Sequence, residues 1–138
     1  MSMEQVRALM EEAEACFLAT TDGQKAAVRP MGGGTWVGDE LWYATFAASA
    51  KVAEIKTHPG VELCYADRKW RHVRITGTCT ISTDNADKRK LYDLVPILKN
   101  YIPDPEAPEY VVLRVKVERI RFMESEDMQY TEVTPPGS

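Results

Sequence analysis

The feature that most constrains the fold is a long alternation of polar and apolar residues between about Trp70 and Ser82. Because successive side chains of a β-strand point to opposite faces, the alternation predicts one long strand with an apolar core face and a polar face. The apolar positions are Val73, Ile75, Cys79 and Ile81, and the opposite positions are Trp70, His72, Arg74, Thr76, Thr78 and Thr80. A polar face that carries a tryptophan is expected to pack on a second subunit or to line a ligand, since aromatic and arginine side chains are enriched at interfaces.

Other strand-like segments surround this one, and most of them are separated by hairpin signals such as Asp22-Gly23. A change in the apolar alternation after Val117 predicts a β-bulge near Glu118. We also expect three short helices, an amphipathic one at the start, one over 50–57 and one ending near Tyr92. The remaining predicted strands are 16–20, 25–31, 41–46, 61–66 and 111–117. About six or seven strands joined mainly by hairpins predict a mainly β fold, a small antiparallel barrel with short helices. A turn at 38–39 is expected to complete a meander of the first strands.

Length and composition narrow the protein class. The 138 residues fit a single domain over 1–138, in which about 1–3 and 125–138 are expected to be flexible tails. With 44% hydrophobic and 28% charged residues, and no apolar run near the roughly 20 residues of a membrane span, we expect neither a disordered nor a membrane protein. The scattered basic residues and a net charge of −4 argue against nucleic-acid binding. The N-terminus lacks the pattern of a secretory signal, so a cytoplasmic location is expected.

The cysteines and histidines give no metal-binding pattern. Cys16, Cys64 and Cys79 are an odd number, are far apart and lie in predicted strands, which indicates reduced, buried thiols. His58 and His72 form no ligand spacing with them or with each other. We therefore expect no metal.

Four residues could together bind a small anion. Arg29 lies on a predicted strand, Thr45 ends another, and Ser49 and Lys51 lie at the start of the short helix. Ser49 occupies the N-cap position, and Lys51 opposes the helix dipole at a cost of about 0.3 to 1 kcal/mol, which a bound anion would reverse. A hydroxyl, an ammonium and a guanidinium are the groups of a phosphate clamp. The alternative is that Ser49 is an ordinary cap and both cations are solvated surface residues.

The run Gly32-Gly33-Gly34 could be taken for a phosphate-binding loop. It is followed by Thr35-Trp-Val rather than by a Lys-Ser/Thr pair and a helix. We therefore interpret it as a bulge, or as a place where a flat ligand approaches the backbone.

The order of these parts resembles the flavin-mononucleotide (FMN)-binding split barrels related to pyridoxamine 5′-phosphate oxidase, in particular the general-stress-protein-like and nitroimidazole-resistance-like branches. The resemblance covers roughly 5–122, nearly the whole chain. Each matching piece is unspecific alone, but their order and intervals are fairly specific. The pieces are Phe17-Leu-Ala-Thr-Thr-Asp-Gly23 with Val28-Arg-Pro-Met31, Trp42-Tyr-Ala-Thr45, Ser49-Ala-Lys51 through His58-Pro-Gly-Val61, and Arg71-His-Val-Arg-Ile-Thr-Gly77.

The resemblance implies FMN as the cofactor and a homodimer with the cofactor at the interface. It assigns the FMN phosphate to Arg29 and Lys51, with further cofactor contacts implied for Met31, Thr45 and Ser49. His72 stands where relatives often place a glutamine near the flavin ring; a histidine that only forms hydrogen bonds across the dimer is the alternative.

The chain departs from true pyridoxamine phosphate oxidases, which it otherwise resembles. Those enzymes carry basic residues where Gly34 and Ala50 stand, a tyrosine-arginine-serine substrate clamp that 88–101 does not contain, and a C-terminal tryptophan and arginine segment. Oxidation of vitamin B6 is therefore not expected.

The function implied is that of a small FMN-dependent oxidoreductase, a reductase or oxidase that takes a small-molecule electron donor and acceptor. The sequence shows no catalytic triad or paired carboxylates, and flavin chemistry requires none. Alternatives are a non-catalytic or stress-related FMN-binding module, a nitroimidazole-type reductase and a structural dimer with a vestigial site. A deazaflavin or haem ligand on the same barrel is a weaker possibility.

Overall fold

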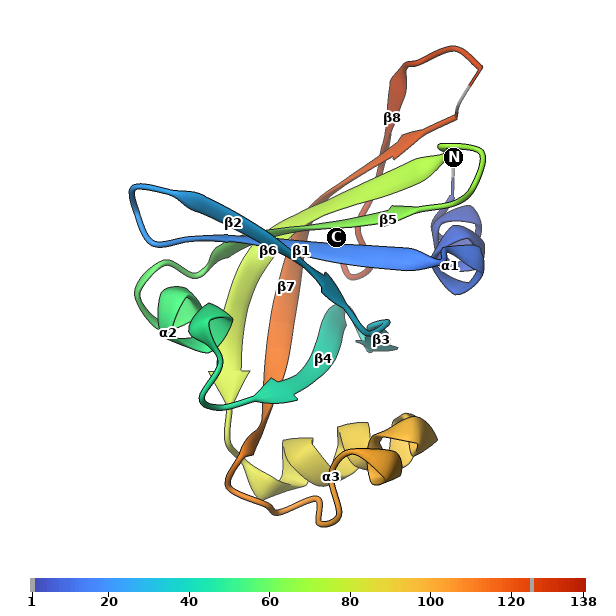
Figure 1. Ribbon diagram of the computed structural model, residues 1–138. Helices are drawn as coiled ribbons and strands as arrows, with labels where there is room; N and C mark the ends of the chain where they lie inside the picture. Colours follow the sequence, from blue (N-terminus) through green and yellow to red (C-terminus); the bar gives the residue numbers. More distant parts are fainter. Residues whose placement is uncertain (1, 125) are drawn as a thin grey trace.

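The computed structural model describes residues 2–124 and 126–138, which form one antiparallel eight-stranded sheet and its covering helices (Figure 1). The helices are α1 (Met3–Glu12), α2 (Ala50–Thr57), α3 (Asn85–Leu94) and the 3₁₀ helix η1 (Pro96–Asn100). The strands are β1 (Ala15–Thr21), β2 (Ala26–Met31), β3 (Thr35–Val37), β4 (Glu40–Phe46), β5 (Gly60–Ala66), β6 (His72–Ser82), β7 (Tyr110–Met123) and β8 (Tyr130–Val133). Among these described helices, none has both the length and the apolar character that crossing a membrane requires.

The sheet curls into a barrel that stays open on one side. Its strand order is β2-β1-β5-β6-β7-β4-β3, and β8 adds to β7. The two end strands, β2 and β3, are not paired with each other in the described part of the chain, so the mainly β fold is a split barrel as predicted. The predicted meander of the first strands is wrong in one respect. The chain leaves one end of the sheet after β2 and, through Gly32–Gly34, enters the other end at β3.

The long alternating strand and the bulge are both present. β6 pairs with β7 over its whole length and with β5 from His72 to Thr78. Thr76 is opposite Arg119 and Gly77 is opposite Val117, which leaves Glu118 as the extra residue and confirms the predicted bulge. A Cβ at Gly77 would lie 2.4 Å from the carbonyl oxygen of Lys116, so the strands approach here more closely than a side chain permits.

Trp70 is not on the strand, which corrects the prediction. It lies in the β5–β6 turn with a positive φ of 69° and is 78% exposed. The carboxylate of Asp67 organises this turn by accepting hydrogen bonds from the backbone N–H groups of Lys69 and Arg71. The alternation of polar and apolar residues had placed Trp70 on the polar face of the strand. Because the chain turns here, the strand begins only at His72.

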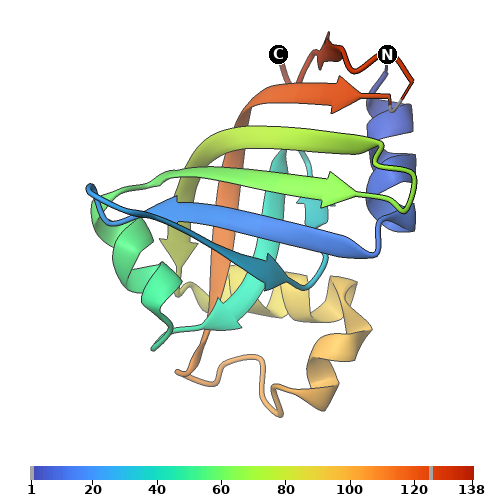
Figure 2. The same cartoon turned by 45° about the horizontal axis from the view of Figure 1, so that its top comes forward.

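Two apolar clusters hold the elements together. The larger fills the barrel and includes Val6 and Leu9 of α1, which covers one end of the barrel, while α2 covers the opposite end (Figure 2). The smaller cluster lies between β4 and the α3–η1 segment and contains Trp42 and Leu91. Because neighbouring residues of β4 point to opposite faces, this strand contributes to both clusters.

The C-terminal segment is part of the sheet, which corrects the expected tail over 125–138. Residues 130–133 pair with β7 as β8, and Val133 is buried in the barrel core. At the other end, Ser2 caps α1, so the helix begins within the expected N-terminal tail. Residues 1 and 125 lie outside the described residues.

Candidate anion-binding site and the adjoining groove

Arg29 is held in place by the strand next to its own. Its Nη1 donates to Thr20 Oγ1 at 2.7 Å and to the carbonyl oxygen of Leu18 at 3.2 Å, both on β1. Its Nη2 lies 3.6 Å from Glu54 Oε2 on α2. The side chain is only 23% exposed, so the guanidinium is fixed near the start of α2 rather than solvated.

Lys51 lies in the first turn of α2 and points back to the end of β4. Its Nζ donates to Thr45 Oγ1 at 2.8 Å. Burial, and then the charge of Arg29, lower the pKa of Lys51 below its ordinary value. The two cations are therefore close enough to repel each other, and neither is free in water, as two solvated surface residues would be.

Ser49 is the N-cap residue of α2 by its backbone conformation, but its side chain does not cap the helix. The hydroxyl donates instead to the carbonyl oxygen of Phe46 at 2.8 Å. The predicted N-cap position of Ser49 is therefore confirmed, although its hydroxyl does not bond the helix. The side chain stabilises the turn that leads from β4 into α2.

Glu54 and Thr20 belong to the site, although the sequence reasoning did not single them out. Thr20 Oγ1 donates to Glu54 Oε2, and the same carboxylate oxygen faces Arg29. A signal for Glu54 was present, because residues three apart share a helix face and Glu54 follows Lys51 at that spacing. Of the two cations, Arg29 faces this carboxylate, and the described group of Arg29, Lys51 and Glu54 keeps an excess of positive charge.

Met31 and His72 differ in their position relative to Arg29 and Lys51. Met31 is on the same face of β2 as Arg29 and packs against the barrel core. His72 begins β6, whereas Cys79 at the far part of β6 contacts Pro59, just after α2. Seven residues of strand separate those points, about 23 Å. Within one chain, the structure therefore does not bring His72 to the two cations; its ring nitrogens bond the carbonyl oxygen of Trp70 and the hydroxyl of Tyr130, each at 2.8 Å.

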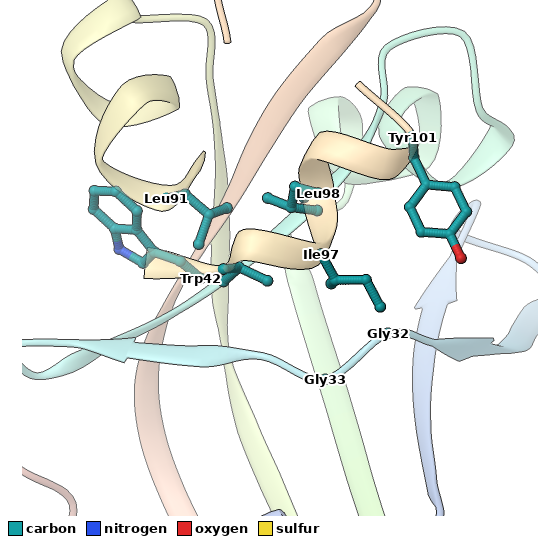
Figure 3. Close-up of a pocket in the computed structure, with 9 residues that line it drawn as sticks. Gly32, Gly33, Trp42, Leu91, Ile97, Leu98 and Tyr101 are labelled. Carbon is teal, nitrogen blue, oxygen red and sulfur yellow. The ribbon is translucent and has the colours of Figure 1, made fainter. Parts of the chain in front are cut away.

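An apolar groove begins at Thr45. A small hollow of about 160 Å³, lined in part by Thr45 and Phe46, shares Ala44, Leu98 and Tyr101 with a larger pocket of about 410 Å³. The larger pocket lies between η1 and the Gly32–Gly33 segment (Figure 3). The glycine run that resembled a phosphate loop is thus one wall of an apolar pocket.

Comparisons with known proteins give one family model and several similar solved structures. The family model described as pyridoxamine 5′-phosphate oxidase like matches residues 1–134. A NimC/NimA family protein from Clostridium acetobutylicum is 21% identical, with a TM-score of 0.82 over 94% of this chain and 90% of that chain. General stress protein 26 from Bacillus anthracis is 22% identical, with a TM-score of 0.74 over 94% of this chain and 96% of that chain.

A third solved structure is a pyridoxamine 5′-phosphate oxidase-related, FMN-binding protein from Nostoc punctiforme. It is 15% identical, with a TM-score of 0.72 over 96% of both chains. At such identities these structures show a common fold alone. No curated protein sequence matches the chain.

Proposed function

Because the chain belongs to the pyridoxamine 5′-phosphate oxidase-like family, as its resemblance predicted, we propose that it binds FMN and acts as a small FMN-dependent oxidoreductase. The observation that carries the proposal is the pair of partly buried cations, Arg29 and Lys51, which repel each other, with Glu54 as the described carboxylate beside Arg29. Such a pair is unfavourable without an anion and favourable with one.

The donor groups at the site fit a phosphate monoester. Arg29 offers a planar fork of N–H donors, Lys51 a compact ammonium, and Thr45 a hydroxyl that already bonds Lys51. Ser49 would reach the same phosphate with its hydroxyl only after leaving the carbonyl oxygen of Phe46. Met31, on the face of β2 that carries Arg29, would contact the cofactor beside its phosphate.

FMN, when bound, supplies hydride or electron transfer, and the protein's task is to hold it and to exclude water. Arg29 and Lys51 neutralise the phosphate. The groove that starts at Thr45 offers apolar walls for a ring system or for its substrate. No side chain of the chain is assigned an acid, base or nucleophilic role.

The working form we propose is a homodimer that accepts a small-molecule electron donor and acceptor. The polar sheet face would form the interface, where Arg74 and Arg121 lie 5.5 and 5.7 Å from the ring centre of Tyr130. Tyr130 is exposed on this face, and a partner subunit would cover its ring. His72 of one subunit would then act near the cofactor of the other.

A titration with FMN followed by visible absorbance and calorimetry tests the proposal. We expect stoichiometric binding by the wild type and weakening of at least about tenfold in Arg29→Ala and in Lys51→Ala, since a hydrogen bond to a charged group contributes about 1.5 to 3 kcal/mol. Lys56→Ala, which removes an exposed lysine of the same helix, is the matched control and should bind normally. Unchanged FMN affinity in both site variants would overturn the proposal that Arg29 and Lys51 bind the phosphate.

The proposed oxidoreductase activity is tested separately. The FMN-loaded protein should oxidise NADH, NADPH or another small donor in the presence of an acceptor. Bound FMN without turnover over a panel of donors would favour the non-catalytic module, and a protein that takes up no FMN would favour the vestigial site.

A further inference from the structure

The larger pocket beside η1 has the size of a small-molecule site. Its volume of about 410 Å³ falls in the usual range of ligand pockets, about 300 to 1,000 Å³. It joins the hollow at Thr45 through Ala44, Leu98 and Tyr101. The two hollows together follow β4 from Thr45, which bonds Lys51, to Trp42, three residues or about 10 Å along the strand.

None of the described residues that line this pocket is charged. Tyr101 contributes a hydroxyl to the lining, and the charged groups around Trp42 are already paired. Trp42 Nε1 donates to Glu40 Oε1 at 2.9 Å. Arg114 lies over the Trp42 ring at 5.0 Å and is bound by the carboxylates of Glu40 and Asp87. The pocket therefore has no charged group left to pair with a charged ligand.

The two walls of the pocket differ in shape. Around Gly32 and Gly33, an added Cβ would meet no atom within 4 Å, so the backbone itself is open to a flat molecule. The opposite wall carries Ile97 and Tyr101, whose side chains point toward the glycine segment (Figure 3). These side chains are 57% and 68% exposed, and a ligand between the walls would cover apolar surface that now faces water.

We propose that this pocket binds an uncharged, planar aromatic molecule, the substrate of the flavin that the clamp holds. The assignment of this molecule as a substrate rests on the proposed function. An anionic or cationic ligand of the same shape would lose its hydration without gaining a partner and would bind more weakly. The pocket thus favours uncharged ligands, whereas the clamp favours an anion.

The test is calorimetric binding of two probes of one ring system, 2-naphthol and naphthalene-2-sulfonate, to the protein saturated with FMN and to the FMN-free protein. We expect 2-naphthol to bind at least about tenfold more tightly than the sulfonate at pH 7. Gly32→Leu should weaken 2-naphthol at least about tenfold by filling the pocket, with FMN affinity retained. Gly60→Leu is the matched control, because a Cβ at Gly60 also meets open space, far from the pocket, and it should change neither affinity.

Ile97→Lys provides a second, surface variant that need not disturb folding, since Ile97 is exposed. It should reverse or abolish the preference for the neutral probe. Equal binding of the two wild-type probes, or failure of 2-naphthol to bind while FMN binds, would overturn this inference and leave the proposed function standing. Loss of 2-naphthol binding on saturation with FMN would also overturn it, because the pocket would then hold the flavin ring. Binding of 2-naphthol by a protein that takes up no FMN would overturn the proposed function and the substrate assignment together.

Discussion

The ammonium nitrogen of Lys51 lies 2.8 Å from the hydroxyl oxygen of Thr45, where burial and the charge of Arg29 both lower its pKa. In the folded protein this cation is less favourable than in the unfolded chain. A bound phosphate would remove the penalty. The clamp therefore lowers the stability of the free protein in exchange for affinity.

Replacing Lys51 by methionine should stabilise the FMN-free protein while weakening FMN binding. The pKa of Lys51 is lower in the folded state than its ordinary 10.5, so between these values the unfolded chain binds more protons and wild-type stability rises with pH. The penalty is thus complete below the folded-state pKa of Lys51 and fades as the pH rises toward 10.5. Thermal melts at pH 7 should show Lys51→Met about 1 to 3 °C above the wild type. Lys56→Met should differ little, and a melting point of Lys51→Met well below the wild type would contradict the account.

Replacing Glu54 by glutamine should increase FMN affinity. The carboxylate of Glu54 faces Arg29 and competes with an incoming anion, whereas glutamine keeps an oxygen for the hydrogen bond from Thr20. Partly exposed ion pairs contribute about 1 kcal/mol or less, so we expect binding about two- to fivefold tighter by calorimetry. Glu109→Gln removes an exposed carboxylate without a contact to Arg29 and should leave the affinity unchanged. Weaker binding by Glu54→Gln would mean that Glu54 orients Arg29 rather than competing for it.

Gly77→Ala should destabilise the barrel beside the bulge. The added Cβ would lie 2.4 Å from the carbonyl oxygen of Lys116 and 2.8 Å from Val115 Cγ1, and a backbone atom in a paired strand cannot move aside easily. We expect a loss of about 1 to 3 kcal/mol in the free energy of unfolding, measured with urea. Gly60→Ala meets open space and should stay within about 0.5 kcal/mol. Equal stability of the two variants would show that the strands are less closely paired than described.

The three thiols should react slowly in the native protein. Burial raises the pKa of Cys16 and raises that of Cys79 to about 12, and burial with the charge of Glu62 raises the pKa of Cys64. Because the thiolate is the reactive form, disulfide reagents at pH 8 should label the native protein slowly and label all three cysteines after unfolding. Cys64, which is only half-buried, should react before the other two. Rapid native labelling of Cys16 or Cys79 would contradict their described positions.

Local patterns predicted the strands and part of the site, because those features depend on neighbouring residues. The alternation of polar and apolar residues predicted most strands. The change in that alternation after Val117 predicted the bulge at Glu118. The intervals between Arg29, Thr45 and Lys51 indicated three side chains that the structure brings together.

Other features depend on contacts between segments that are far apart in the sequence, and local patterns do not indicate such contacts. Nothing near Gly32–Gly34 indicates that the chain crosses to the other end of the sheet. β8 offers a single buried apolar residue, Val133, within a polar segment. For Trp70, the turn built by Asp67 overrode the alternation. The hydroxyl of Ser49 donates to the carbonyl oxygen of Phe46 and does not accept from the first N–H groups of α2.

The most direct test of the phosphate clamp compares FMN with riboflavin, which has the same ring and ribityl chain but no phosphate. Isothermal titration at moderate salt should show FMN binding at least about 100-fold more tightly than riboflavin, from two charge-assisted contacts of about 1.5 to 3 kcal/mol each. The difference should shrink in the Arg29→Ala, Lys51→Ala double variant. Equal affinity of the wild type for the two flavins would contradict the claim that Arg29 and Lys51 hold a phosphate.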